Sequence, residues 1–430
     1  MQDTQTPPQG SRIAIIGSGI SGLATAYLLS RRYAVTLFEQ GDYLGGHTNS
    51  VELTLDGVSH PVDTGFLVFN DRTYPNLIAL FKELGVSSHE SEMTFSVSVD
   101  QGRIEWAGSN LDTVFAQRGN LLSPRFWRML KDILRFNGDA AGNLQATEQS
   151  GETLGELLKR QNYGRAFADE YLLPMAAAIW SSPTDDILNF PASTFLHFCR
   201  NHGLLQVSNR PQWRTVRGGA KDYVSRIASQ LSDIRMRCAV TGVWREGGRV
   251  RIQHQGGEEH YDAIVLAGHA PDSLAMLRDA DAQEHDVLSA VRYQDNTAWL
   301  HSDIALLPKR KKVWSAWNYM GGIDAAGERP VCVSYLINRL QPLPFNLPVI
   351  VTLNPFSPPA TALTYGRYHY AHPLLDRSAI AAQAKLPSLQ GLRSTWFAGA
   401  WTGYGFHEDG LKSALRVAKD FGCLPHWARL

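Results

Sequence analysis

The sequence has few cysteines, no excess charge of either sign and no long apolar run. Its four cysteines stand far apart without a CxxC pair, which argues against a disulfide framework or a cysteine zinc site and favours reduced thiols. Lysine plus arginine and aspartate plus glutamate balance at 41 each, so no overall field draws the chain to nucleic acid. The apolar stretch at residues 13–29 is short and interrupted by glycine and serine. We therefore expect a cytoplasmic protein with no transmembrane segment and no nucleic-acid partner.

Metal-binding and hydrolase motifs are also missing. His407 and Glu408 begin an HExxH-like sequence, but position 411 is leucine, so the second metal-binding histidine is absent. No GxSxG nucleophile elbow follows a predicted strand. We expect no metal site. A general base at His407 or Glu408 and a purely structural role of this turn, with Asp409 as a helix cap, both stay open.

The chain has 430 residues, of which 44% are hydrophobic and 19% charged, as in ordinary globular proteins. This length is too great for one compact core, so two packed domains are expected. The order strand 12–17, helix 20–31 and strand 34–39 forms a βαβ unit. Asp56-Gly57 predicts a hairpin between residues 50–55 and 58–62.

A GxGxxG motif, Gly17-Ser-Gly19-Ile-Ser-Gly22, joins the first strand to the first helix. Gly17 allows the tight turn, Gly19 lets backbone approach a pyrophosphate, and Gly22 allows close helix packing. The helix N-terminus attracts phosphate, and an acid at the end of the next strand accepts hydrogen bonds from ribose. The predicted nucleotide-binding residues of this unit are Gly17, Gly19, Ile20, Ser21, Gly22, Glu39 and Gln40.

Three further glycine-containing segments favour FAD over NAD. They are Leu44–Thr48, Asp63–Gly65 and the glycine-dense stretch 397–410 before the last helix. Such backbone can approach a cofactor that extends beyond the first pyrophosphate contacts. The additional predicted contacts are Gly45, Gly46, His47, Thr64, Gly65, Phe66 and Gly399.

These motifs resemble the flavin amine oxidase superfamily, which includes protoporphyrinogen oxidase and the phytoene desaturases. The resemblance covers nearly the whole chain. It is closer to a bacterial branch of predicted NAD/FAD-binding proteins, through the phrases at residues 62–70, 72–76, 210–219 and 403–411. The resemblance implies FAD as cofactor, with Val240 at the adenine, Arg217–Gly219 near the flavin ring, and the last helix at the pyrimidine edge. It adds to the binding set Arg217, Gly218, Gly219, Val240, Ala267, Gly410 and Leu411.

Two departures from the family pattern concern the reaction. His47 stands where many members have arginine after the glycine pair. Phe406 occupies one position of the aromatic pair that encloses an amine, Tyr404 is only nearby, and no partner ring is identifiable. These departures count against amine oxidation. The candidate catalytic residues are Tyr404, Phe406 and His407.

The resemblance also implies a lipid substrate, because relatives in this branch tend to be encoded beside, or fused to, cyclopropane-fatty-acid-synthase-like methyltransferases. A flavin would take a hydride from a carbon of a fatty acyl or related chain, in desaturation or in double-bond isomerisation. The alternatives are an FAD-dependent amine oxidase and a flavin-carrying accessory protein of a lipid methyltransferase. Seven aromatic residues either line an acyl channel or pack in the core: Phe66, Phe69, Trp106, Trp180, Trp314, Trp317 and Tyr335.

The expected fold is α/β, with a Rossmann-type FAD-binding domain and an α+β substrate domain. Residues 1–73, 212–290 and 390–430 form the FAD domain, and residues 74–211 and 291–389 form the substrate domain. Residues 125–136 are basic and amphipathic, typical either of a helix on a membrane surface or of an ordinary buried helix. Expected helices cover residues 74–84, 124–136, 153–160, 164–179, 191–202, 222–231 and 411–420; expected later strands cover 235–240, 250–254, 263–267 and 396–400.

Overall fold

The computed structural model describes residues 7–206, 210–322 and 331–430. A five-stranded parallel sheet has the order β10-β2-β1-β14-β20. Of its central strands, β14 is apolar and buried along its whole length and β1 is so from Ile13 onward, as in sheets covered on both faces. Strands from three distant parts of the chain therefore form one sheet, as the sequence predicts: β1 Arg12–Ile16, β2 Ala34–Phe38, β10 Ile234–Arg235, β14 Ala263–Leu266 and β20 Thr395–Phe397.

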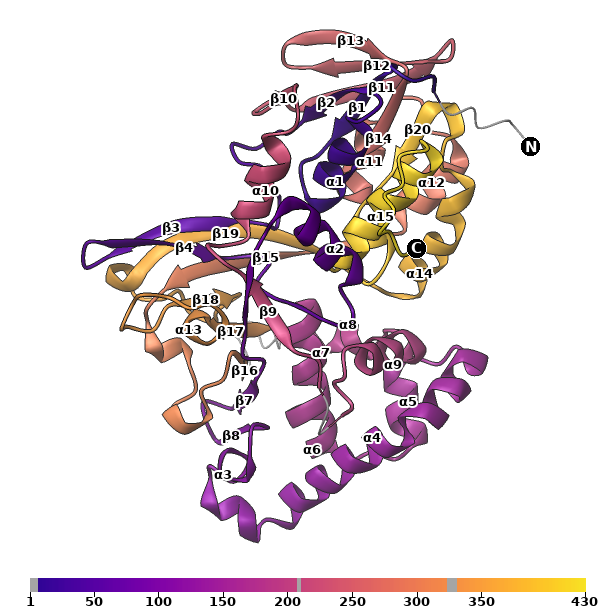
Figure 1. Ribbon diagram of the computed structural model, residues 1–430. Helices are drawn as coiled ribbons and strands as arrows, with labels where there is room; N and C mark the ends of the chain where they lie inside the picture. The colour runs from indigo at the N-terminus through magenta and orange to yellow at the C-terminus, as the bar shows by residue number, and fades with distance from the viewer. Residues whose placement is uncertain (1–6, 207–209, 323–330) are drawn as a thin grey trace.

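Helix α1 (Ile20–Leu29) is buried along its whole length and packs against α15 (His407–Asp420), the last helix. Figure 1 shows both helices beside the parallel sheet in the upper part of the molecule. Helix α15 begins four residues before the expected Leu411, because Asp409 closes its first turn by accepting a hydrogen bond from the Phe406 N–H at 3.0 Å. The part of the molecule around the parallel sheet is called the nucleotide-binding half here. It contains four further helices: α10 Lys221–Ala228, α11 Ala270–Met276, α12 Ala282–Ser289 and α14 Arg377–Lys385.

A three-stranded antiparallel sheet contains β11 (Val240–Glu246), β12 (Arg249–His254) and β13 (Gly257–Tyr261). The strand expected at residues 235–240 is wrong. Arg237 adopts a left-handed φ of 50° and its N–H bonds to the Gly41 carbonyl oxygen, so the chain turns between β10 and β11. The hairpin expected at Asp56-Gly57 is confirmed, with β3 Ser50–Leu55 paired to β4 Val58–Asp63.

The segments expected to form the substrate domain, which we call the substrate half, contain a seven-stranded sheet of order β19-β15-β18-β17-β16-β7-β8. The segment 74–211, expected to be mostly helical, supplies β7 and β8. Strand β7 has the alternating sequence FSVSV and pairs in parallel with β16. A smaller sheet contains β5 Phe69–Asn70, β6 Ser88–Glu90 and β9 Trp213–Val216. The seven strands are β7 Phe95–Val99, β8 Ile104–Ala107, β15 Tyr293–His301, β16 Trp317–Gly321, β17 Cys332–Leu336, β18 Ile350–Leu353 and β19 Thr364–Pro373.

Helices form the rest of the substrate half and occupy the lower part of Figure 1. Helix α4 continues to Ser150, well past the expected end at residue 136, because buried Asn143, Leu144 and Thr147 continue its inward face. The helix expected at residues 164–179 is divided by a π-helical turn, Ala168–Leu172, just before Pro174, which has no N–H to donate. The helices are α3 Leu111–Val114, α4 Pro124–Ser150, α5 Leu154–Arg160, α6 Arg165–Phe167, α7 Leu173–Trp180, α8 Thr184–Leu188 and α9 Ala192–Asn201. Helix α2 (Pro75–Leu84) instead packs against α10 and α15 in the nucleotide-binding half.

Across the described residues, every helix is too short or too polar to cross a lipid bilayer.

Candidate cofactor and substrate site

One cavity of about 1360 Å³ joins the two halves of the molecule. At one end it touches the β1–α1 turn, and at the other it extends between α7 and strands of the seven-stranded sheet. The cavity reaches the carboxyl edge of the parallel sheet, where ligands bind in open α/β folds. Its position agrees with a cofactor at one end and a substrate at the other.

The GxGxxG glycines have three different environments. Gly17 has a φ of 100°, and a Cβ there would lie 3.2 Å from the backbone of Ala267. Gly19 lines the cavity, and a Cβ there would meet no atom within 4 Å. A Cβ on Gly22 would lie 1.8 Å from the Gly17 carbonyl oxygen. The tight turn at Gly17 and the close packing at Gly22 are confirmed, and Gly19 leaves backbone open to a ligand.

Glu39 lines the same end of the cavity, directly after β2. Its Oε2 accepts hydrogen bonds from the Ser18 N–H at 3.0 Å and from the Ser18 hydroxyl at 2.5 Å. Its Oε1 accepts from the Gly41 N–H at 2.7 Å. Three donors therefore fix the carboxylate beside the glycine turn, where the sequence places an acceptor for ribose.

The second glycine pair packs directly on the first motif. Gly45 and Gly46 both have left-handed φ values, 114° and 58°, and a Cβ on Gly46 would lie 3.3 Å from the Gly19 Cα. A Cβ on Gly65 would lie 2.1 Å from the His47 carbonyl oxygen. Glycine is thus required where three chain segments meet. The predicted contacts that line the cavity are Gly17, Gly19, Ile20, Ser21, Glu39, Gln40, Gly45, Gly46, His47, Thr64, Gly65, Phe66, Val240, Ala267 and Gly399.

His47 points an unpaired nitrogen into this region. Its buried Nε2 has no hydrogen-bond partner among the described residues, and the rings of Tyr370 and His372 lie 5.1 Å from its ring. Burial and the neighbouring histidines lower the pKa of His47 well below its usual value, so the imidazole is neutral. His47 therefore offers a hydrogen-bonding group to a ligand instead of the positive charge that arginine would bring.

An open glycine cradle, a fixed carboxylate and an unpaired imidazole together fit a phosphate-bearing dinucleotide. Histidines at 269 and 372 and Tyr370 also line the cavity, and sequence reasoning missed them. The alternation of aromatic and polar residues in β19, at residues 368–372, was the available signal.

His407 starts helix α15 and lines the cavity. Its Nε2 lies 3.0 Å from the Thr48 hydroxyl and 2.9 Å from the Tyr223 hydroxyl, and its ring stacks on Phe66 with centroids 3.6 Å apart. Burial lowers the pKa of His407 to about 3. A neutral imidazole with such a pKa is a weak base at neutral pH. The geometry gives His407 a positioning role in the cavity wall.

The next two acids are structural. The buried carboxylate of Glu408 accepts hydrogen bonds from the Asn76 and Leu77 N–H groups, both at 3.0 Å, and from Asn76 Nδ2 at 2.7 Å. Burial raises the pKa of Asp409 to about 6, although the Phe406 N–H bonds to it. Neither side chain lines the cavity. Glu408 therefore fastens α15 to the start of α2, and Asp409 is a helix cap.

The candidate catalytic aromatics Phe406 and Tyr404 both line the cavity. The Phe406 ring stacks on Phe198 with centroids 4.9 Å apart and an interplanar angle of 24°, and Tyr404 lies 6.1 Å from Phe198. A group sandwiched between two rings needs about 7 Å, two van der Waals contacts, between their centres. Phe406 and Phe198 therefore form a stacked pair with no space between them for an amine.

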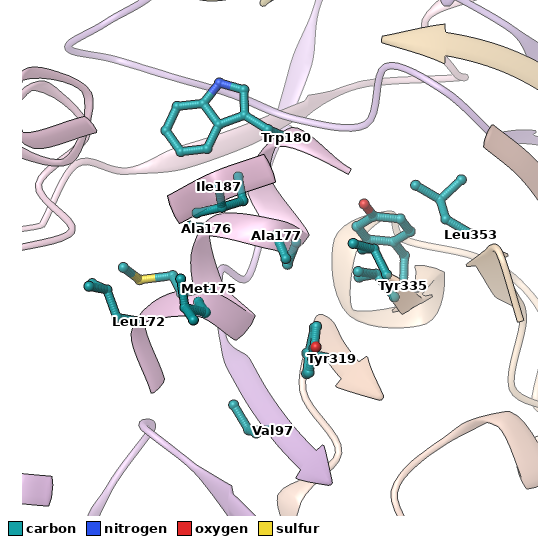
Figure 2. Close-up of a cluster of buried hydrophobic side chains, with 14 of the residues drawn as sticks. Val97, Leu172, Met175, Ala176, Ala177, Trp180, Ile187, Tyr319, Tyr335 and Leu353 are labelled. Carbon is teal, nitrogen blue, oxygen red and sulfur yellow. The ribbon is translucent and has the colours of Figure 1, made fainter. Parts of the chain in front are cut away.

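The far end of the cavity is apolar. Helix α7 faces strands β16–β18 across it, and Figure 2 shows Met175 and Trp180 on the helix with Tyr335 and Leu353 on the sheet. No lysine lines the cavity within the described part of the chain. The apolar lining consists mainly of Met93, Phe95, Trp106, Tyr171, Met175, Ala178, Ile179, Trp180, Phe198, Trp213, Trp317, Tyr335 and Leu353.

Five of the seven predicted aromatics line the cavity, and two do not. Phe69 packs against Phe81, with ring centroids 5.3 Å apart, in the core of the nucleotide-binding half. Trp314 packs beside a small cluster that includes Leu336 and Ile350. For these two residues the alternative of ordinary core packing is correct.

Several predicted cofactor contacts support the cavity from behind. A Cβ on Gly219 would meet Ser50 and Pro61 of the β3–β4 hairpin, and buried Asp63 accepts a hydrogen bond from the Ala220 N–H at 2.9 Å. This bond holds the Arg217–Gly219 turn against the hairpin. A Cβ on Gly410 would lie 2.7 Å from Ile20 Cγ2. The residues outside the cavity lining are Gly22, Arg217, Gly218, Gly219, Gly410 and the fully buried Leu411.

The fold and the cavity define a class: an α/β protein with a Rossmann-type parallel sheet, whose glycine-lined cavity continues into a mainly apolar chamber. The family model for flavin containing amine oxidoreductases matches residues 20–298. The chain belongs to this family, and a flavin is the cofactor that membership implies.

Its relatives differ in substrate. The chain is 24% identical over 280 residues to the flavin-containing amine oxidase A of Sus scrofa, covering 62% of this chain and 50% of that protein. It is 27% identical over 187 residues to the 15-cis-phytoene desaturase of Narcissus pseudonarcissus, covering 40% and 32%. The chain spans little more than half of the curated relatives' length, at most 57% in these comparisons. A CLA-producing fatty acid isomerase from P. acnes shares the fold at a TM-score of 0.67 and 17% identity, covering 96% of this chain and 98% of that one.

Proposed function

We propose that the protein is an FAD-dependent oxidoreductase that takes a hydride from a carbon of a fatty acyl chain or a related lipid. The observation that carries this proposal is the single cavity that runs from the glycine cradle into an aromatic and aliphatic chamber. Ligand pockets commonly have volumes of about 300–1,000 Å³. A cavity of about 1360 Å³ has room for a dinucleotide and a second ligand.

Particular residues would hold each part of the cofactor. Gly17, Gly19 and the N-terminus of α1 would contact the pyrophosphate, and Glu39 the ribose. The stacked pair of His407 and Phe66 would form a wall beside the ring system. Bound FAD supplies a two-electron acceptor for a hydride.

The protein contributes a chamber with a mainly apolar lining. Aromatic walls exclude water and hold an apolar chain by its buried surface. His407 stays neutral and is fixed by Thr48 and Tyr223, so it adds no charge beside the reacting carbon. We assign to this wall the role of orienting the reacting carbon, and not of abstracting a proton as a strong base.

The chamber is compatible with both desaturation and isomerisation. Desaturation would transfer a hydride from one C–H bond to a bound flavin and release a proton from the neighbouring carbon to solvent, and an external acceptor would then have to reoxidise the flavin. In isomerisation the hydride returns to another carbon of the same chain, and no external acceptor is consumed. The names of a phytoene desaturase and a fatty acid isomerase among the similar proteins support this pair of reactions.

Amine oxidation is the second candidate, favoured by the amine oxidase among the relatives. The site offers little support for it. Phe406 stacks against Phe198 instead of facing a second ring across an open gap, and the described cavity lining contains no lysine. The third candidate, a flavin-carrying accessory protein of a lipid methyltransferase, needs the flavin site but no reactive chamber.

We also propose a cyclopropane-fatty-acid-synthase-like methyltransferase as a partner, and a cytoplasmic location. The support for the location is that all four cysteines are free thiols. The support for the partner is the lipid chemistry assigned to the chamber, because both proteins would act on acyl chains. Co-purification of the two proteins checks this pairing.

Anaerobic mixing of the flavin-loaded protein with unsaturated fatty acyl substrates tests the function. Loss of the visible flavin absorption with a new double bond in the extracted lipid is the result for a desaturase. A shifted double bond without net loss of absorption is the result for an isomerase. Bleaching by amines but not by lipids would replace the proposal with amine oxidation, and no reaction with either would favour the accessory role.

A further inference from the structure

Large apolar side chains are exposed together at one end of the substrate half. Leu122, which ends the 3₁₀ turn Arg118–Leu122, is 88% exposed, and Leu111 in α3 is 77% exposed. Trp127 and Leu134 on α4 are 50% and 64% exposed. Apolar side chains gathered in this way on a surface mark an interaction site. We call Leu111, Leu121, Leu122, Trp127 and Leu134 the apolar patch.

The patch has a fixed structure. The Trp127 indole N–H donates to the Leu121 carbonyl oxygen at 2.9 Å, and its ring lies 5.3 Å from the ring of Phe115. Trp127 and Leu134 are seven residues apart, two helical turns, and so share one face of α4. These side chains are exposed, and the helices α3 and α4 that carry three of them lie at the lower end of the molecule in Figure 1.

Cations lie beside the patch. Lys131 lies on α4 between Trp127 and Leu134, and the loop of residues 309–312 approaches α3 through a 2.6 Å contact between Lys312 and Asp112. Among the residues described, Lys131, Lys309 and Lys311 have no ion-pair partner. Asp112 is shared by Lys312 and Arg118. The surroundings of the patch are thus net positive, which suits an anionic surface.

The cavity opens next to this patch. Gly108 and Ser109 line the cavity and are exposed, two or three residues before Leu111 begins α3. Arg210 also lines the cavity and is exposed. Burial raises the pKa of Tyr171, and the positive charge of Arg210 partly opposes this rise, so Arg210 lies near Tyr171. The Tyr171 ring in turn lies 6.0 Å from the Trp106 ring. Gly108, Ser109 and Arg210, which are among the exposed residues of the lining, therefore lie near the same apolar wall.

We propose that the apolar patch and its neighbouring lysines dock on an anionic lipid bilayer, and that the acyl substrate passes from the bilayer into the cavity beside Gly108 and Ser109. The docking stands on the patch and its charges alone, whereas the passage of substrate rests on the proposed function. Leucine and tryptophan insert among lipid headgroups while lysines contact anionic phosphates. The inference explains why the cavity mouth adjoins exposed leucines.

Vesicle flotation tests the docking. The flavin-loaded protein is mixed with vesicles of phosphatidylcholine alone, or of phosphatidylcholine and phosphatidylglycerol in equal parts. We expect binding to the mixed vesicles that weakens with salt. The double variant Leu111→Gln/Leu122→Gln should lower the partition coefficient by about tenfold or more. Lys131→Gln/Lys309→Gln should lower it several-fold at low salt only.

Matched controls change exposed residues elsewhere. Leu424→Gln removes another exposed leucine, and Lys159→Gln/Lys419→Gln removes two exposed lysines on α5 and α15. These variants should float like the wild type. Failure of the wild type to float with mixed vesicles, or equal flotation of the patch variants, overturns the proposal. A dimer that Leu111→Gln/Leu122→Gln dissociates, without any vesicle binding, would reassign the patch to a protein contact.

A turnover assay separates this inference from the proposed function. With a short acyl substrate dispersed in detergent, the leucine variants should turn over at the wild-type rate, because their cavity is unchanged. With substrate embedded in mixed vesicles, they should be slower by the same factor as their loss of binding. A protein that floats but reacts with no lipid would refute the proposed function and leave the docking intact.

Discussion

Single residues in the cofactor cradle differ in what a side chain would do there. Gly19 and Gly22 belong to one motif, yet a Cβ on Gly19 meets open cavity whereas one on Gly22 meets the backbone of Gly17. The first position affects the ligand and the second affects folding. Sequence alone predicts that glycine is needed at both, because few other residues fit such turns and close approaches.

The variants Gly19→Ala and Gly22→Ala should therefore change different properties, FAD affinity in the first and the free energy of unfolding in the second. Gly19→Ala should change the free energy of unfolding by less than about 0.5 kcal/mol and weaken FAD binding by about tenfold or more. Gly22→Ala should cost more than about 3 kcal/mol, because its Cβ would lie 1.8 Å from a carbonyl oxygen. Urea unfolding and flavin titration measure the two quantities. Equal destabilisation by both variants would contradict this division.

His47 and His407 show what residue-level reading of a sequence leaves out. The sequence places both near the cofactor, and both line the cavity. Their charge state depends on burial, which comes from segments far away in the chain, such as β19 beside His47 and α10 beside His407. For this reason a general base at His407 was a fair hypothesis from sequence, and the surrounding packing makes it a neutral wall residue.

At the scale of elements, the contact between α15 and α2 depends on one carboxylate. Glu408 is buried and accepts three hydrogen bonds from the first residues of α2. The helix N-terminus itself also favours a negative charge at this point. An acid beside a candidate catalytic residue suggests chemistry in the sequence, and its partners in α2 give it a structural role instead.

Glu408→Ala should lower the free energy of unfolding by about 3 kcal/mol, because three buried donors lose their acceptor. Glu408→Gln keeps one oxygen acceptor and should lose less. The control Arg416→Ala changes an exposed side chain on the same helix and should be nearly neutral. The rate per bound flavin should be unchanged in Glu408→Gln. A large loss of that rate with normal stability would restore Glu408 as a catalytic group.

The elements that sequence reasoning predicted well are local, and those it missed depend on distant pairing. The βαβ unit and the Asp56-Gly57 hairpin follow from glycine turns and strand periodicity within about thirty residues. Strands β7 and β8 lie in a segment that the sequence pattern predicts to be mostly helical. Strand β7 pairs in the seven-stranded sheet with β16, which comes from much later in the chain. Long-range pairing of this kind is weakly encoded in one short strand sequence.

At the scale of the whole molecule, buried histidines couple stability to pH. Burial lowers the pKa of His202, His301 and His372 to about 4, and that of His407 to about 3. Unfolding returns each to about 6.5. As pH falls below 6.5, these histidines become protonated in the unfolded chain but stay neutral in the folded one. The stability that is present above pH 6.5 is therefore lost between pH 6.5 and pH 4.

Three buried acids act in the opposite direction. Burial raises the pKa of Asp63 to about 7, that of Asp409 to about 6 and that of Glu408 above its usual value, so the folded state takes up these protons first as pH falls. Their contribution to stability therefore rises as pH decreases from about 7 toward 4. The histidines outnumber them, so the net result should be a nearly constant stability around neutral pH and a steep loss below about pH 6.

Urea unfolding at pH 7.5, 6, 5 and 4 measures this dependence. His202→Phe should make the acid loss shallower, by up to about 3 kcal/mol at pH 4, because it removes one histidine with a lowered pKa while keeping a ring stacked on Phe198. The exposed His426→Phe should leave the dependence unchanged. Stability that does not fall between pH 6 and 5 would contradict this set of pKa values.

The proposed function requires that one cavity of the molecule hold two ligands in separate compartments. The decisive measurement is extraction and mass spectrometry of the purified protein, compared with the chamber-filling variant Ala178→Trp. The account predicts one FAD and a bound acyl chain per wild-type molecule, and in Ala178→Trp an undiminished FAD content with the acyl chain lost. Recovery of no acyl chain from wild-type protein supplied with lipid, or its full retention in Ala178→Trp, would contradict the account.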